Sequence, residues 1–454
     1  MLKEIPSREI LSDLPEQFYW PRAETVKPPW DINVIAVAAH PSGARAILPL
    51  VGELIKKGTG CALITPHSQH GQERAATAFT RQYPFSRPPE LGSAPPISET
   101  LSPNKANLVI FTASGGGDET LEISAIESAV KWKKLGNKVI IVGVEGEASE
   151  LVGTIKQLKE SVVNPEHEID ALFLANRLPC QFYLDLSVPA SKLIPTGPTG
   201  FDFLHQEDTQ KLGDNFRKTL GINPSDIVIV HNAIRGTGLW SEIEIDATPK
   251  VLSAIFKLAA SRPDKKFVFV YRFHPDDQQP EVLSQELNSL TEIPENLRLV
   301  IHQPADSRAD GRSPLAAANL VITTVSTTNT GVALCGAKPA AVRPHTGHMP
   351  LYFISPIAEK ELEKTGTILP TASQLQAAAV AGIDQELLPT IEKALFDSDF
   401  RRRIFNAQAT ALREIYRFKG TATATYRTLL QLRRLLKNPN PTFSPPHFLP
   451  NPLS

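Results

Sequence analysis

The sequence predicts an α/β protein made of two doubly wound parallel-sheet domains that face a cleft, followed by C-terminal helices. Short apolar, β-branched runs alternate with apolar residues at helical spacing through two successive stretches. That alternation is typical of parallel sheets covered by helices on both faces. The 454 residues, 41% of them hydrophobic, are enough to build two cores. The segment TGPTGFDFLHQED separates the two stretches.

The first domain is predicted over residues 1–205. A helix pattern over 47–55 follows the first strand, and Pro49 should either delay its start or kink it. A second, longer helix pattern follows a triglycine. The strands are expected at 33–39, 61–65, 108–112, 138–144, 171–174 and 192–194.

The second domain is predicted over residues 206–400. Helices are expected at 249–260 and 281–290, with a short apolar helix at 332–334. Two domains of this kind place a cleft between the carboxyl ends of two parallel sheets, where open α/β folds bind ligands. The strands are expected at 226–230, 266–271, 297–301, 320–324 and 339–342.

The last part of the chain changes composition. Residues 401–438 are predicted to form basic helices, because ten Lys or Arg residues stand against the single acidic Glu414. Two interpretations are open. One is a solvated face whose apolar stripe packs on the body, and the other is an electrostatic contact with an anionic membrane or acidic polymers. The stripe consists of Phe405, Leu412, Ile415 and Tyr416. Residues 439–454 contain six prolines and are predicted to be a disordered tail.

Composition and motifs exclude several classes. The formal net charge of -1 removes any argument from global charge for a nucleic-acid partner. Cys61, Cys180 and Cys335 form no CxxC pair, which argues against a disulfide framework or a cysteine-rich zinc site. No P-loop, G-x-G-x-x-G or G-x-S-x-G motif occurs. Without a signal-peptide core or a membrane-spanning apolar run, the sequence predicts a cytoplasmic protein that is soluble or peripheral at the inner membrane face.

Four segments carry a resemblance to a known group: VIFTASGGGDETLEISAIESA, IPTGPTGFDFL, YRFHPDD and ANLVITTVSTTNTGVALCGAKP. Together they resemble GT-B-type glycosyltransferases and their relatives, which include non-hydrolysing UDP-N-acetylglucosamine 2-epimerases and CDP-glycerol polymerases. The likeness spans about residues 33–400. It implies two Rossmann-like domains, with the nucleotide held by the C-terminal domain and the acceptor by the N-terminal one. It also implies no cofactor beyond a nucleotide-activated sugar as co-substrate.

Three loops supply the groups that a nucleotide diphosphate needs, which are backbone N–H donors at a helix start, hydroxyls and cations. Each has a plainer interpretation: a surface arginine, a structural histidine, or hydroxyls that only cap a helix. The resemblance favours donor binding. The residues are Asn232, Arg235, Gly236 and Thr237, then Arg272 and His274, then Ser326, Thr327, Thr328 and Asn329.

One position departs from the resemblance. Many relatives place a glutamate at the start of the helix after the third loop, where it holds the ribose. This sequence has Gly331, Val332 and Ala333 there. Either another group binds the ribose, or the chain is a catalytically degenerate binding protein.

Transfer to a hydroxyl acceptor also needs a general base. Candidates are His40, at the end of the first strand, and Asp118 or Glu119 after the triglycine, although Asp118 could equally cap the following helix. The acceptor-side loops contain Ser42 and Gly43, then Ser114, Gly115 and Gly116.

No metal is predicted. His345 and His348 are interpreted as cleft-lining or loop residues, because no third ligand is near in sequence. The predicted function is metal-independent glycosyl transfer from a nucleotide-activated donor. The alternatives are nucleotide-sugar 2-epimerisation, which would require more carboxylates in the cleft, and binding without catalysis.

Overall fold

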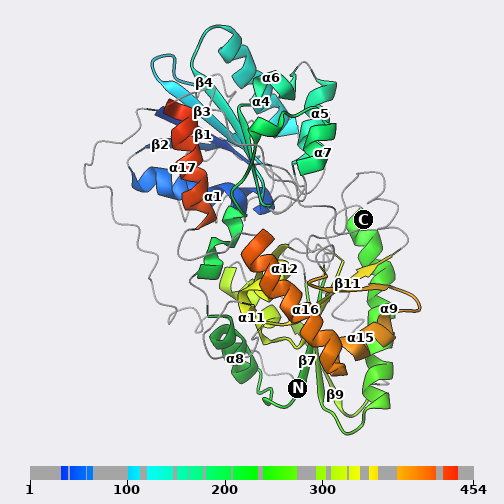
Figure 1. The fold of residues 1–454 in the computed structure, drawn as a ribbon. Coiled ribbons are helices and arrows are strands. Elements are labelled where there is room, and N and C mark those ends of the chain that lie inside the picture. Colours follow the sequence, from blue (N-terminus) through cyan, green and yellow to red (C-terminus); the bar gives the residue numbers. More distant parts are fainter. Residues whose placement is uncertain are drawn as a thin grey trace.

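The computed structural model describes residues 32–38, 41–57, 59–64, 101–112, 120–146, 151–161, 163–176, 180–205, 208–233, 239–273, 293–302, 308–324, 327–337, 347–355, 376–415 and 423–437. It contains two six-stranded sheets, each parallel throughout and flanked by helices (Figure 1). The predicted fold class, two doubly wound α/β units, is confirmed. The boundary near residue 205 remains a prediction.

The first sheet has the strand order β2-β1-β3-β4-β5-β6. All six predicted strands are present, within a few residues of the expected bounds. Most of the described valine, isoleucine and leucine side chains in these strands are buried, as both faces of a covered parallel sheet require. The strands are β1 (Ile32–Val37), β2 (Gly60–Ile64), β3 (Ala106–Phe111), β4 (Val139–Val144), β5 (Ala171–Leu174) and β6 (Leu193–Pro195).

Helices cover this sheet on both faces. One core packs α4 (Thr120–Lys134), α5 (Val152–Glu160) and α7 (Cys180–Asp185) on the sheet, and the other packs α1 (Pro41–Lys56) on it. Helix α1 begins at Pro41 and continues through Pro49, so the late start that this proline could have caused does not occur. The remaining helical turns are α6 (Pro165–Glu168), η1 (Ala190–Lys192) and η2 (Thr199–His205).

The second sheet has the strand order β12-β11-β10-β7-β8-β9. Four of the predicted strands are present. The predicted strand 339–342 and helix 281–290 lie outside the described residues. The strands are β7 (Ile227–Asn232), β8 (Phe267–Arg272), β9 (Leu297–His302), β10 (Leu320–Thr323), β11 (Met349–Ile354) and β12 (Ala379–Gly382).

Two strands of this sheet were not predicted. Strand β11 contains Pro350, which argues against a central strand, and β12 is alanine-rich. Both are nevertheless paired in register, Tyr352 with Val380 for example. Side-chain burial in the assembled sheet therefore overrides weak local propensity.

Helices pack on both faces of the second sheet as well. Helix α9 begins ten residues earlier than predicted and includes Pro249. The helices are α8 (Thr209–Thr219), α9 (Leu239–Ser261), α11 (Arg308–Ala317), α12 (Thr327–Gly336), α15 (Leu387–Phe396) and α16 (Ser398–Thr410), the last continuing into a π-helical turn, η3 (Ala411–Ile415).

The C-terminal helices divide between the two units. Helix α16 belongs to the second unit, where Phe405 packs against the core that includes residues of α9 and α15, and Leu412 is fully buried in a neighbouring cluster. The described part of the predicted apolar stripe thus packs on the body. Helix α17 (Ala424–Lys437) instead joins the first unit beside α1, as the red helix in Figure 1 shows.

The segment η2 contacts both units. The Thr199 hydroxyl donates to the carbonyl oxygen of Ala46 in α1. Phe201 packs in a cluster with Leu334 of α12 and Tyr352 of β11. Element η2 therefore connects α1 with the helix that follows β10.

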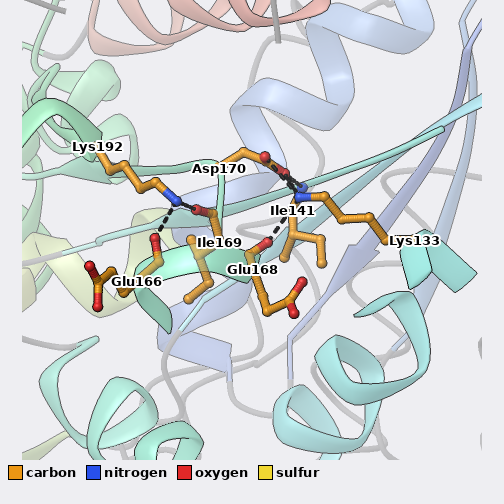
Figure 2. A network of polar contacts seen from close by, with 7 residues as sticks. All are labelled: Lys133, Ile141, Glu166, Glu168, Ile169, Asp170 and Lys192. Carbon is orange, nitrogen blue, oxygen red and sulfur yellow. Dashed lines mark hydrogen bonds and ion pairs between the residues drawn. The ribbon is translucent and has the colours of Figure 1, made fainter. Parts of the chain in front are cut away.

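Polar contacts hold the amino edge of the first sheet together (Figure 2). Lys133 of α4 donates to both carboxylate oxygens of Asp170 at 2.9 and 3.0 Å, and Asp170 also accepts from the Ile141 N–H at 2.8 Å. Lys192 donates to two carbonyl oxygens, of Glu166 and Ile169. Burial lowers the pKa of Lys192 from its ordinary value. These contacts join α4, β4 and the segments that precede β5 and β6, and the charged groups are occupied by protein partners, so we assign them a structural role.

Two further features bear on the predictions. Cys61 and Cys180 are thiols outside any disulfide, and burial raises the pKa of Cys61 to about 12. Across the part of the chain that the structure describes, no helix has the length and apolar content needed to cross a membrane.

Candidate functional site

Three polar residues meet at the carboxyl edge of the second sheet, and two of them, Asn232 and Arg272, are predicted donor-binding residues. Strand β7 ends at Asn232, β8 at Arg272 and β10 at Thr323, and these strands are adjacent in the order β10-β7-β8. Asn232 is the register partner of Arg272. The sequence places each residue last in its strand, and the parallel sheet then brings all three to one edge.

Hydrogen bonds hold Asn232, Arg272 and Thr323 together. The Arg272 Nη1 donates to the Asn232 Oδ1, and the Thr323 hydroxyl donates to the Asn232 carbonyl oxygen at 2.9 Å. Arg272 is 7% exposed and Asn232 2%. The contact with the neutral Asn232 amide orients the Arg272 guanidinium. The edge therefore holds a positively charged group in a set direction.

The helix after β10 begins at the same edge. Helix α12 starts at Thr327, four residues past the end of β10, so its N-terminal N–H groups and the positive end of its dipole lie at the carboxyl edge. A cation and a helix N-terminus on one sheet edge can bind a phosphate or another anion.

Asn329, a predicted phosphate ligand, lies in the interior. It is fully buried, and its Oδ1 accepts a hydrogen bond from the Nε2 of His348, which precedes β11. The next residue, Thr330, shares a 2.8 Å hydrogen bond with the Tyr352 hydroxyl of β11. These contacts hold the first turn of α12 on β11. His348, expected at a cleft surface or in a loop, is a buried partner of this helix.

A second buried network lies behind the edge. His231, next to Asn232 in β7, is hydrogen-bonded through Nε2 to the Glu244 carboxylate of α9. Thr248 reaches both Glu244 and the Tyr271 hydroxyl at 3.3 Å. The network ties β7 and β8 to α9. Sequence reasoning missed it because it started α9 at residue 249, beyond Glu244.

The first sheet has a carboxylate at its own carboxyl edge. Glu145 follows β4 directly and is fully buried. Its carboxylate accepts from the Tyr183 hydroxyl of α7 and from the Ala175 N–H at 3.0 Å. The sequence signal for this residue is an acid immediately after the apolar run VIIVGV.

Most of the other predicted site residues are not described, and Ser42, Thr327 and Thr328 are described in their backbone alone. Ser42 is helical in α1, and Thr327 and Thr328 form the first turn of α12. Gly43 is buried in α1. The predicted residues outside the described parts are His40, Ser114, Gly115, Gly116, Asp118, Glu119, Arg235, Gly236, Thr237, His274 and Ser326. Within the parts that are described, no three His, Cys, Asp or Glu side chains gather as a metal site would require.

Solved structures share the whole architecture. A UDP-GlcNAc 2-epimerase from Neisseria meningitidis, solved with UDP-GlcNAc bound, matches with a TM-score of 0.55 and 15% identity over 90% of this chain and 100% of its own. A glycosyltransferase from Rickettsia africae matches with a TM-score of 0.55 and 11% identity over 90% and 99%. Anabaena HepE in complex with UDP matches with a TM-score of 0.54 and 13% identity over 89% and 100%.

These likenesses establish the fold. The chain has the GT-B-like arrangement of two doubly wound domains, and the resemblance inferred from the four sequence segments is confirmed at that level. No protein-family model and no curated protein matches the sequence.

Proposed function

We propose that the chain is an enzyme that binds a nucleotide-activated sugar and transfers its glycosyl group to a hydroxyl acceptor. The observation that carries this proposal is the Arg272–Asn232 pair at the carboxyl edge of β7 and β8, beside the N-terminus of α12. Three solved structures of the same fold support it: one holds UDP-GlcNAc, one is a glycosyltransferase, and one holds UDP.

The chemistry required of this edge is stabilisation of the leaving diphosphate. As the glycosidic bond breaks, negative charge grows on the phosphate oxygens, and preoriented cations and helix N–H groups lower the energy of that state. Arg272 can donate two parallel hydrogen bonds to a phosphate. Such a site can operate without a metal ion. The predicted bases His40, Asp118 and Glu119 belong to this proposal as the groups that deprotonate the acceptor.

In this proposal, the ribose of the bound nucleotide contacts a different part of the protein from the helix position that holds it in relatives. Val332 and Ala333 are 1% and 2% exposed and pack in the interior. These positions therefore supply no hydrogen-bonding side chain to a ligand. The proposal places the ribose contact elsewhere on the carboxyl edge.

Nucleotide-sugar 2-epimerisation is the second candidate. The observation that favours it is Glu145, a carboxylate at the carboxyl edge of the first sheet that is held by Tyr183. Epimerisation removes and returns a proton at the carbon next to the anomeric centre, and a positioned carboxylate can do this. Binding without catalysis is the third candidate, motivated by the missing ribose glutamate.

Calorimetric titration of the full chain with UDP, CDP and GDP tests the shared premise. We expect one of them to bind, and Arg272→Ala to weaken that binding about tenfold to hundredfold. Arg217→Ala is the matched control, because Arg217 lies at the opposite edge of the same sheet. If none of the nucleotides binds, or if both variants weaken binding equally, the proposed donor site is wrong.

Incubation with the nucleotide sugar that matches the bound nucleotide separates the candidate reactions. Epimerisation converts the donor in the absence of an acceptor and incorporates solvent deuterium at the epimerised carbon. Transfer leaves the donor stereochemistry unchanged and releases nucleoside diphosphate only when a hydroxyl acceptor is added. Tight nucleotide binding with neither product would support the binding protein.

A further inference from the structure

Helix α17 presents one face to the protein and the opposite face to solvent. Leu429, Leu432 and Leu435 are buried against α1 and the first sheet. At its start, Asp202 accepts from the backbone N–H groups of Ala424 and Thr425 at 2.8 and 2.9 Å. The apolar contacts and the cap hold the helix, so its outer face has a fixed orientation.

The outer face combines cations with apolar side chains. Its residues are spaced by three or four positions and therefore line one side of the helix. Tyr426 is 54% exposed and Leu430 is 40% exposed. No acidic residue occurs in α17. The outer face consists of Tyr426, Leu430, Arg433, Arg434 and Lys437.

The direction of α17 determines where the cations lie. Helix α1 starts just past the carboxyl end of β1, and α17 starts beside Thr196 at the carboxyl end of β6, to which Thr428 and Arg427 bind. Both helices therefore run toward the amino edge of the first sheet. Fourteen residues of α-helix span about 20 Å. The basic end of α17 consequently lies away from the carboxyl edge at which ligands of this fold class bind.

Among the residues of α1 and its end whose side chains are described, one more cation and one acidic residue lie near α17. Lys57, exposed at the end of α1, adds another cation at the same edge. The carboxylate that α1 carries in its helical span, Glu53, is only partly exposed. In the described part of the chain, the end of α17 thus gathers exposed cations, although the whole chain has a formal net charge of -1.

We propose that the outer face of α17 docks the first unit on an anionic phospholipid bilayer. Cations beside a helix are attracted by acidic headgroups, and exposed tyrosine and leucine side chains can enter the headgroup boundary. The apolar side chains favour a lipid surface over a nucleic acid, whose phosphates would be contacted by the cations alone. The inference does not depend on the reaction catalysed.

Co-sedimentation of the full chain with vesicles tests this inference. We expect binding to an equal mixture of phosphatidylcholine and phosphatidylserine, and none to phosphatidylcholine alone. The variant Arg433→Gln/Arg434→Gln/Lys437→Gln should weaken binding about tenfold or more, as should added salt. Tyr426→Ser/Leu430→Ser should weaken binding while leaving its salt dependence in place.

A matched control removes three cations from the second unit. Lys257, Lys265 and Lys266 are exposed there, and their replacement by glutamine changes the net charge equally. This control should bind vesicles as the unmodified chain does. Absence of vesicle binding by the unmodified chain would overturn the proposal, as would equal loss in the control. Tighter binding to single-stranded RNA than to acidic vesicles would assign the face to nucleic acid instead.

Discussion

Two Arg–Asn pairs sit at opposite edges of the second sheet, and they have different surroundings. At the amino edge, Arg217 of α8 donates to the Asn319 Oδ1 at 2.9 Å. It also donates to the carbonyl oxygens of Ala317, Asn223 and Asp226. At the carboxyl edge, Arg272 donates to the Asn232 Oδ1 beside the N-terminus of α12.

The comparison shows that position in the sheet, rather than residue type, separates a structural arginine from a candidate ligand-binding one. Arg217 makes five hydrogen bonds to protein oxygens, as many as its guanidinium has N–H groups, and burial lowers its pKa from the ordinary value. It closes the loops that precede β7 and β10. Arg272 ends its strand at the edge at which ligands of open α/β sheets bind.

The largest expected effect is on stability, from Arg217→Ala. This change leaves several carbonyl groups without their donor and should lower the free energy of unfolding by about 3 kcal/mol. Urea unfolding measures it. Nucleotide affinity, measured at low temperature where the variant remains folded, should be unchanged. A loss of affinity equal to that of Arg272→Ala would remove the distinction between the two edges.

The next largest expected effect is a loss of nucleotide affinity, caused by Asn232→Ala. Without its amide partner the Arg272 guanidinium loses one constraint on its direction, and nucleotide affinity should fall about tenfold, or about 1.4 kcal/mol. Asn319→Ala is the matched control. It removes the acceptor for Arg217 and for the Val228 N–H at 2.8 Å, so it should lower stability and leave affinity unchanged. If Asn319→Ala weakened nucleotide binding and Asn232→Ala did not, the ligand site would lie at the amino edge.

The sequence predicted the carboxyl-edge pair better than the rest of the site for a physical reason. A polar residue immediately after a buried strand of a parallel sheet must lie at the ligand-binding edge, and Asn232 and Arg272 both end such strands. The sheet class and ten of the twelve described strands follow from the alternation of apolar strand runs with helix patterns.

Contacts between distant segments were not predictable in this way. Nothing local in the sequence indicates that Asn329 is held by His348, or that Glu244 meets His231. Strand β12 is alanine-rich and is defined by its pairing with β11. The return of α17 to the first unit likewise depends on Asp202, more than two hundred residues earlier in the chain.

A smaller effect is expected from Thr323→Val. The hydroxyl donates to the Asn232 carbonyl oxygen at 2.9 Å, and both residues are buried. Valine has nearly the same shape but leaves that oxygen without this donor, which should cost about 1 kcal/mol of stability. A several-fold loss of nucleotide affinity should accompany it, because β7 and β10 are joined here. Urea unfolding and calorimetry on one preparation separate the two effects.

The smallest effect is expected from Arg298→Ala. Arg298 is exposed near the start of β9, and its Nη1 donates to the Leu220 carbonyl oxygen at 2.8 Å. Loss of a solvent-exposed contact should change stability by about 0.5 kcal/mol or less. Nucleotide affinity should not change, although the variant loses the same charge as Arg272→Ala. If Arg298→Ala weakened nucleotide binding to the same degree, overall charge would explain the effect of Arg272, and the carboxyl edge would lose its special role.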